Sequence, residues 1–214
     1  SITSGLSVNV IESFCRLGNI GSFFDLTIQE PDSGDDLFPN DVINIEVDVD
    51  NNDDEDRDVI VEADLFDVTD NDFLNEEVET SGSINNDGSE SFDLEYTIPS
   101  DVKDTHRYRL FVKVFEDGEE ETQCEEKSVS IDIKRETHSV IIDKYNIPEI
   151  VSCSGTFDAS LTLENVGKRD EDVKFRLINQ ELGINEETTF ALDKEDKRTV
   201  SLPISIQADA KEKN

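Results

Sequence analysis

The chain has 214 residues, of which 53 are Asp or Glu and 19 are Lys or Arg, so its formal net charge is −34. Such a charge repels nucleic acid and anionic membrane surfaces, and neither is expected as a partner. No apolar run approaches the roughly 18 residues that a membrane span needs, so direct membrane insertion is not expected either. Because 35% of the residues are hydrophobic and fall in ordered patterns, the sequence predicts a folded protein.

Residues 1–21 form an N-terminal segment that precedes the first regular strand pattern. Within it, Leu6, Val8 and Val10 alternate with polar residues, which is typical of a strand with one buried face. We expect an extra strand here, or a donor strand that adds to a neighbouring molecule.

The rest of the chain alternates apolar and polar residues with a period of two. The predicted inward faces are Ile43/Ile45/Val47/Val49, Val59/Val61/Ala63/Leu65, Phe92/Leu94/Tyr96/Ile98 and Val129/Ile131/Ile133. This period with β-branched and aromatic residues indicates half-buried antiparallel strands. The segment 108–115 (YRLFVKVF) is apolar on both faces and is predicted to be a central strand. Since no amphipathic helix is evident, the fold class is all-β.

The stretch 48–59 (DVDNNDDEDRDV) lies between two predicted strands and is dense in carboxylates. It fails as an EF-hand loop, because Asp53 stands where Gly is needed and Val59 where a bidentate Glu is needed. Weakly bound calcium is the one cofactor considered. Its candidate ligands are Asp53, Asp54, Asp56 and Asp58. A second acidic run, 67–77, could bridge to this loop if the two lie together, but a solvated polar turn is the simpler interpretation of both.

An internal repeat gives the domain organisation. Residues 47–61 align without a gap on residues 161–175 at an offset of 114, matching Asn51 to Asn165, and residues 96–102 resemble 204–210. Two copies of about 110 residues predict two tandem immunoglobulin-like antiparallel β-sandwiches.

The first sandwich is expected over residues 22–135 and the second over 136–214, with a linker at 134–138. After residues 204–210 no segment matches the last two strands of the first copy. The second sandwich is therefore predicted to lack a central strand and an edge strand. Either further sequence supplies them, or a neighbour donates a strand, with residues 1–14 as the natural donor.

Three cysteines match no zinc or redox spacing. Cys15 precedes the first strand and Cys124 precedes the last, and in a seven-stranded sandwich both strands begin at the same pole. We therefore predict a Cys15–Cys124 disulfide, with Cys153 at the opposite end of the molecule. The alternative is three reduced thiols.

Catalysis is not expected. The chain lacks a nucleophile elbow, a P-loop and a dinucleotide-binding glycine motif. His106 and His138 have no Cys, His or Glu at metal-ligand spacing. The sequence thus predicts a protein that is not an enzyme and has no metal centre beyond the weak calcium candidate.

Several segments resemble surface-layer and cell-envelope proteins of small-genome archaea. The resemblance rests on residues 14–28 (FCRLGNIGSFFDLTI), 51–65, 108–124, 135–142 and 163–177. It implies an exported architectural protein at the cell surface, built of tandem sandwiches. The second copy is also similar to cell-adhesion-related domains, whose second strand ends in a turn such as Asn165-Val166-Gly167.

The predicted function is a structural subunit of an archaeal cell envelope, in a surface layer or an extracellular filament. Its partners would be copies of itself or neighbouring envelope proteins, contacted through the linker 134–138, the acidic loop and the cysteines. The alternative is an adhesin or ligand-binding ectodomain, which needs an exposed apolar loop. Its two candidates, Leu37-Phe38 and Phe73-Leu74, are better explained as buried anchors.

Overall fold

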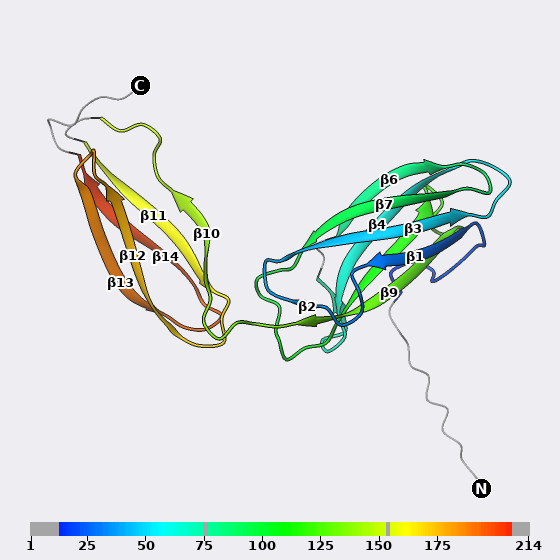
Figure 1. Cartoon of the computed structure of the whole chain (residues 1–214), viewed down its shortest axis with the longest axis horizontal. Coiled ribbons are helices and arrows are strands. Elements are labelled where there is room, and N and C mark those ends of the chain that lie inside the picture. Colours follow the sequence, from blue (N-terminus) through cyan, green and yellow to red (C-terminus); the bar gives the residue numbers. More distant parts are fainter. Residues whose placement is uncertain (1–12, 75–76, 153–154, 207–214) are drawn as a thin grey trace, which may run out of the picture. The chain divides into compact units, whose positions relative to one another are not determined.

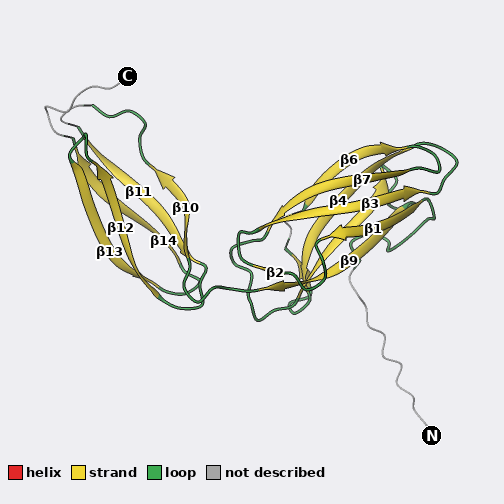
Figure 2. Cartoon of the chain, viewed as in Figure 1, coloured by secondary structure: helices red, strands yellow, loops and turns green. Residues whose placement is uncertain are grey.

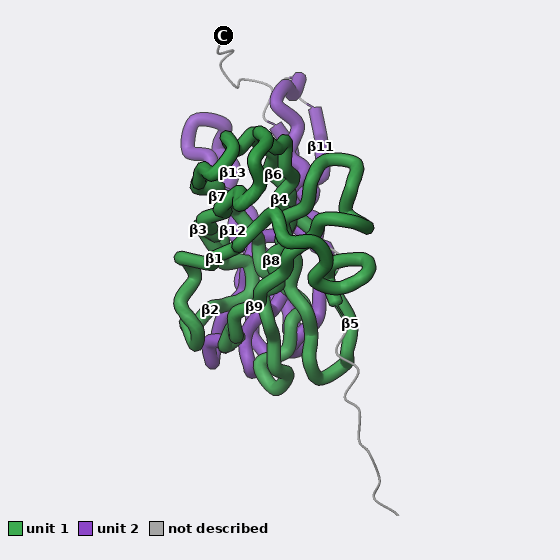
Figure 3. The backbone as a smooth tube through the Cα atoms, turned by 90° about the vertical axis from the view of Figure 1, so that its right-hand side faces the viewer, with its two compact units in different colours: residues 1–134 green, residues 135–214 purple. Residues whose placement is uncertain are grey.

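The computed structural model describes residues 13–74, 77–152 and 155–206 (Figure 1). Strands and loops make up all of this part of the chain, as Figure 2 shows. No helix in the described ranges is long and apolar enough to cross a membrane. The chain divides into two compact units, 1–134 and 135–214, coloured separately in Figure 3.

Unit 1 contains two antiparallel β-sheets that face each other. The smaller has the order β1 (Phe24–Glu30), β3 (Val42–Asn51), β7 (Ser89–Thr97). The larger has the order β2 (Asp36–Leu37), β9 (Cys124–Ile133), β8 (Tyr108–Glu116), β4 (Arg57–Asp67), β5 (Asp72–Phe73), and β6 (Val78–Ile84) also pairs with β4. Only the short β2 runs parallel to its neighbour.

The core of unit 1 lies between these sheets. Every second residue of β3, β4 and β7 points inward, because successive side chains of a strand alternate between its faces. Val47 and Val49 on β3 face Val61 and Ala63 on β4, and all four are fully buried. β8 pairs with β4 on one side and β9 on the other, which confirms the predicted central strand.

Unit 2 has a smaller version of the same arrangement. One sheet has the order β10 (Val140–Asn146), β11 (Thr156–Asn165), β14 (Lys197–Ser205), and the other pairs β12 (Glu171–Asn179) with β13 (Ile184–Leu192). These strands correspond in order to β1, β3, β7, β4 and β6. The described residues of unit 2 contain no counterpart of β8 and β9.

The structure therefore has the predicted fold, two immunoglobulin-like sandwiches of which the second is the smaller. The boundary between the two units in the sequence falls between Lys134 and Arg135, at the start of the predicted linker. The structure describes part of the predicted N-terminal segment 1–21. Residues 13–21 pack on unit 1, and Ile20 forms an antiparallel bridge with Cys124. Residues 1–12, the greater part of the proposed donor strand, lie outside the described ranges.

Strand ends extend beyond the apolar patterns that predict the strands. The apolar alternation of the last strand of unit 1 begins at Val129, but β9 begins at Cys124. Its first three residues pair with Lys113, Val114 and Phe115 of β8. Backbone pairing continues through polar residues such as Glu125, where the apolar pattern stops, because the ladder depends on N–H and C=O groups.

Candidate functional site

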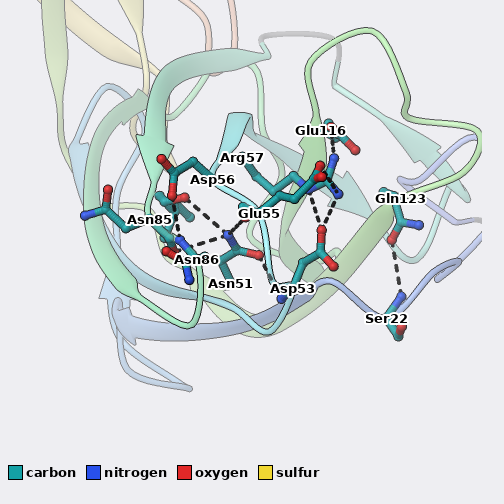
Figure 4. A network of polar contacts seen from close by, with 11 residues as sticks. Ser22, Asn51, Asp53, Glu55, Asp56, Arg57, Asn85, Asn86, Glu116 and Gln123 are labelled. Carbon is teal, nitrogen blue, oxygen red and sulfur yellow. Dashed lines mark hydrogen bonds and ion pairs between the residues drawn. The ribbon is translucent and has the colours of Figure 1, made fainter.

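Asn51 organises the acidic loop between β3 and β4 (Figure 4). Its side chain is fully buried, and the amide nitrogen donates to the carbonyl oxygens of Glu55, Ile84 and Asn85 at 2.9 to 3.2 Å. Its Oδ1 accepts the N–H of Asp53 at 3.1 Å. One side chain thus holds the β3–β4 loop against the β6–β7 turn.

Arg57 is the cation of this loop and offsets part of its acidic charge. Its guanidinium forms ion pairs with Asp53 and Glu55, and donates to Glu116 at 2.8 Å. It also lies 4.5 Å from the ring centroid of Phe23. The hydrogen bond from Arg57 lowers the pKa of Asp53, and the contacts with Asp53 and Glu116 raise the pKa of Arg57. Asp53 is therefore held as an ion by a protein cation.

The four calcium candidates do not converge on one point. Asp53 faces Arg57, while Asp56 accepts the N–H of Asn86 at 2.9 Å. Asp54 and Asp58 are exposed. In the described ranges, the group of ligand atoms within 4.8 Å of one another is a different one, Asp67, Asp70 and His106. Calcium binding by the acidic loop stays a prediction, without a set of convergent ligands to support it.

Unit 2 repeats the asparagine-centred turn with fewer carboxylates, because Gly167, Lys168 and Arg169 replace Asp53, Asp54 and Glu55. Asn165 is also fully buried, donates to the carbonyl oxygens of Arg169 and Leu192, and accepts the N–H of Gly167. These three partners occupy the positions of Glu55, Ile84 and Asp53 in unit 1. The asparagine therefore has a structural role in both units. An aspartate is shared as well, because Asp170, the equivalent of Asp56, accepts the N–H of Lys194 as Asp56 accepts that of Asn86. Asp53, Asp54 and Glu55 are the carboxylates that are specific to unit 1.

The second acidic run lies at the other end of β4, so the suggested bridge between the two acidic loops is wrong. Asp67 begins a turn there, and its Oδ1 accepts the N–H groups of Thr69 and Asp70. Its other oxygen lies 2.6 Å from Nδ1 of His106. Burial disfavours the carboxylate, yet the hydrogen bond with His106 and those backbone N–H groups lower the pKa of Asp67.

This Asp67–His106 pair was missed in the sequence because 39 residues separate its members. The same holds for His138, whose Nδ1 lies 2.6 Å from Glu171, 33 residues away. Both histidines fasten a loop to a strand end through a carboxylate. No local spacing could have found either contact, since strand pairing decides which loops meet.

A disulfide joins Cys15 to Cys124 across 109 residues, the pair that the sequence analysis selected. Both cysteines are buried, and they pack against Phe115. The N–H of Cys15 donates to Glu126 at 2.5 Å. The bond therefore ties the segment that starts at residue 13 to the first residue of β9. Cys153 lies outside the described residues.

The same segment covers the outer face of the larger sheet of unit 1. The Phe14 ring stacks on Phe73 with centroids 5.1 Å apart, and Phe73 contacts Phe66 and Phe111. This outer aromatic cluster explains why 108–115 is apolar on both faces. It also confirms that Phe73 is an anchor rather than an exposed binding loop. Leu37 and Leu74 likewise pack against the core.

A buried ion pair lies beside this cluster. Glu62 and Lys113 are directly paired on β4 and β8, with Oε2 and Nζ 2.7 Å apart, and Nζ also contacts Glu120 at 2.9 Å. Burial and the neighbouring Glu77 raise the pKa of Glu62 to about 7. Burial also opposes the charge of Lys113, but its carboxylate partners outweigh this and raise its pKa. The outward position of both residues was predictable, whereas their burial was not.

Comparisons with known proteins do not identify a family for this chain. No family model matches the chain, and no curated protein matches it. Among solved structures, a red sea bream transglutaminase is similar over 87% of this chain and 27% of its own length, with 12% identity and a TM-score of 0.36. A sporulation control protein of Bacillus subtilis covers 85% of this chain and 89% of its own, with 11% identity and a TM-score of 0.40. A Bacteroides uniformis β-glucuronidase covers 60% of this chain and 15% of its own, with 12% identity and a TM-score of 0.37. The chain thus spans about a quarter or less of the two enzymes.

Proposed function

We propose that the chain is a non-enzymatic structural subunit of an archaeal cell envelope, in a surface layer or an extracellular filament. The observation that carries the proposal is the tandem of two sandwiches built on the same asparagine-centred turn. In both units the buried amide of this turn fastens loops together, at Asn51 and at Asn165. Stiff repeated units with fastened loops suit a mechanical role.

Two further features support an extracellular location. The Cys15–Cys124 bond belongs to a class of crosslink that persists in oxidising compartments. The net charge of −34 maintains a solvated surface and disfavours non-specific contacts with nucleic acid and anionic lipid. Assembly partners are then other copies of the chain or neighbouring envelope proteins, contacted at specific edges rather than through bulk charge.

The test is to locate the protein on the cells that make it. Intact cells are labelled with a membrane-impermeant amine reagent, and antibody-gold microscopy follows the protein in thin sections and in negative stain. We expect surface labelling in ordered sheets or filaments. A cytoplasmic protein that stays unlabelled shows that the cells are intact. Protection of the chain from the reagent contradicts the surface location, and dispersed single particles at the surface favour an adhesin module instead.

A further inference from the structure

The outer edge of β12 differs from the equivalent edge in unit 1. β4 pairs with β6 on one side and with β8 on the other, whereas the described residues of unit 2 pair β12 with β13 alone. The inward residues along it are less covered as well. Val173 and Leu177 are half-buried, while their equivalents Val59 and Ala63 are fully buried. Within the part of unit 2 that the structure describes, a backbone edge and the apolar row beside it therefore lack the cover that β8 supplies in unit 1.

The two outer edges of the β10–β11–β14 sheet are unsuited to strand addition. Pro203 lies within β14, and proline has no N–H to donate. The β10–β11 ladder shifts register between Ile142 and Lys144, which disturbs a regular edge. β12 contains neither Pro nor Gly and pairs with β13 without a shift from Glu171 to Asn179. Its other edge is thus a regular template for a further strand.

The chain itself contains a segment with the sequence pattern of β8. Residues 6–12 read LSVNVIE, and residues 110–116 of β8 read LFVKVFE. The two share the leucine, both valines and the final glutamate. In unit 1 the corresponding Leu110, Val112 and Val114 are fully buried against the smaller sheet. Residues 6–12 therefore carry the inward pattern of the strand that fills this edge in unit 1.

Charge also favours this segment as the partner. Residues 1–11 contain no Asp, Glu, Lys or Arg, in a chain whose net charge is −34. An uncharged strand can approach a strongly acidic copy of the chain without adding repulsion. In unit 1, the edge of β4 that is equivalent to this edge of β12 is already paired with β8. Residues 6–12 therefore cannot bind there.

We propose that residues 6–12 of one copy pair with β12 of a second copy and complete its two-stranded sheet. This deepens the proposed function, on which it rests, by naming the partner and the contact. Each copy would then provide a donor strand, residues 6–12, and an acceptor edge on β12. Such head-to-tail contacts build an open filament when they do not close into a ring. The Cys15–Cys124 bond would carry tension from the donated strand into unit 1.

The register follows from the β4–β8 ladder. There Val61 pairs with Val114, and Glu62 with Lys113. The offset of 114 from β4 to β12, together with the match of residues 6–12 to 110–116, places Val10 opposite Phe175. Asn9 then lies opposite Arg176, with both side chains on the outward face. Arg176 is half-exposed and pairs with Asn185 on β13, so it tolerates replacement.

Two single-site variants test this contact when mixed. One chain carries Asn9→Cys and the other Arg176→Cys, both in a Cys153→Ser background, and the mixture is oxidised under mild conditions. We expect a reducible heterodimer in the mixture and its loss when Val8→Asp and Val10→Asp are added to the donor chain. The matched control replaces the acceptor by Asn185→Cys, which lies one strand further away and should give little product. Absence of the heterodimer, or equal yield with the control, overturns the inference.

Two further outcomes separate this inference from the proposed function. A single chain that carries both Asn9→Cys and Arg176→Cys should form ladders of linked chains. A bond formed within one chain instead overturns the assignment to a second copy. If Val8→Asp/Val10→Asp chains still form the same filaments under the microscope, the strand contact is wrong and the structural role stands. If the unaltered chain stays monomeric at every concentration and never appears in assemblies, the proposed function fails, and the inference fails with it.

Discussion

Unit 1 and unit 2 share strand order and inward pattern but differ in how well the pattern is buried. Val47 and Val59 of unit 1 are 0% and 1% exposed. Leu161 and Val173, which align with them at the offset of 114, are only half-buried. The side chains point the same way in both units, so the local pattern is obeyed in each. The number of strands in the opposite sheet determines how completely these side chains are buried. It therefore also determines how much apolar burial stabilises the unit.

The loops after β3 and β11 show the opposite relation, because their buried contacts agree while their exposed residues differ. Asn51 and Asn165 make the same kind of contacts, although Asp54 and Glu55 in one loop become Lys168 and Arg169 in the other. A buried amide tolerates little change, because its loss leaves buried carbonyl groups unpaired. The exposed residues around it vary freely, even in the sign of their charge.

The largest expected difference between the units is in hydrogen exchange of the full chain. Amides of β12 (Glu171–Asn179) should exchange about 10³ to 10⁴ times faster than those of β4 (Arg57–Asp67), a gap of about 4–5 kcal/mol in opening free energy. The reason is that β4 is central in a six-stranded sheet, whereas β12 has one described partner. Exchange followed by mass spectrometry of peptic fragments measures both segments in one sample. Equal protection in dilute, monomeric protein would contradict the difference in cover.

Removal of the disulfide should reduce the stability of unit 1. Cys15→Ala with Cys124→Ala frees a loop of 109 residues. Chain entropy alone would give a loss of about 4.7 kcal/mol, and we expect about 3–4 kcal/mol, within the range usual for disulfides. Urea unfolding followed by tyrosine fluorescence suits this test, because Tyr96 and Tyr108 are buried in unit 1. Cys153→Ala alone is the matched control. A loss confined to unit 2 in exchange experiments would show that the bond does not support the first sandwich.

The asparagine turns should respond alike in both units. Asn51→Ala and Asn165→Ala each remove a buried amide with several backbone partners, at an expected cost of about 2–3 kcal/mol to the unit concerned. Unit-resolved hydrogen exchange separates the two effects. Asn52→Ala, at an exposed neighbouring position, is the control and should change stability by less than about 0.5 kcal/mol. A large effect in one unit only would show that the turns are not equivalent.

The smallest expected effect is a pH dependence confined to unit 1. Burial raises the pKa of Glu62 to about 7 from its ordinary 4.5, so the folded state binds the proton more tightly than the unfolded state. The stabilisation from this proton is complete below pH 4.5 and is lost as the pH rises to about 7. Between pH 4.5 and about 7, the free energy of unfolding of unit 1 should fall by about 1–2 kcal/mol less in Glu62→Gln than in the native chain. The reason is that the glutamine amide stays neutral throughout this range.

Unit 2 serves as the internal reference for that titration. Its residue at the equivalent position is Arg176, which is half-exposed and is not a carboxylate. Urea midpoints at several pH values, measured for the native chain and for Glu62→Gln, provide the test. An unchanged slope in the variant would mean that other carboxylates dominate the pH dependence.

Much of the fold was predictable because a period of two in β-branched residues directly reports which face of a strand is buried. Ile43, Ile45, Val47 and Val49 are all buried in β3, as their alternation indicated. The internal repeat also predicted the division into two units. Strand ends such as Cys124 were less predictable, since backbone pairing continues where the apolar pattern stops.

The candidate site was predicted only in part. The turn beginning at Asn51 could be identified because it recurs at Asn165, and the Cys15–Cys124 pair followed from the strands that begin near each cysteine. The contacts of Arg57 were not all found, because its partner Glu116 comes from the end of β8, 59 residues away. The pattern of charges along the chain does not reveal which of them meet across a sheet.

The sequence by itself thus determined the strand faces, the two-unit repeat and the positions of the asparagine turns, because each of them is visible as a pattern along the chain. The tertiary structure alone decided that Glu62 meets Lys113, that Asp67 meets His106, and that Phe14 covers the outer sheet face. These contacts join residues 39 or more positions apart, and a shift of one residue in strand register would separate every one of them. Register is set by turns and by packing across the whole sandwich, and a local pattern cannot specify it.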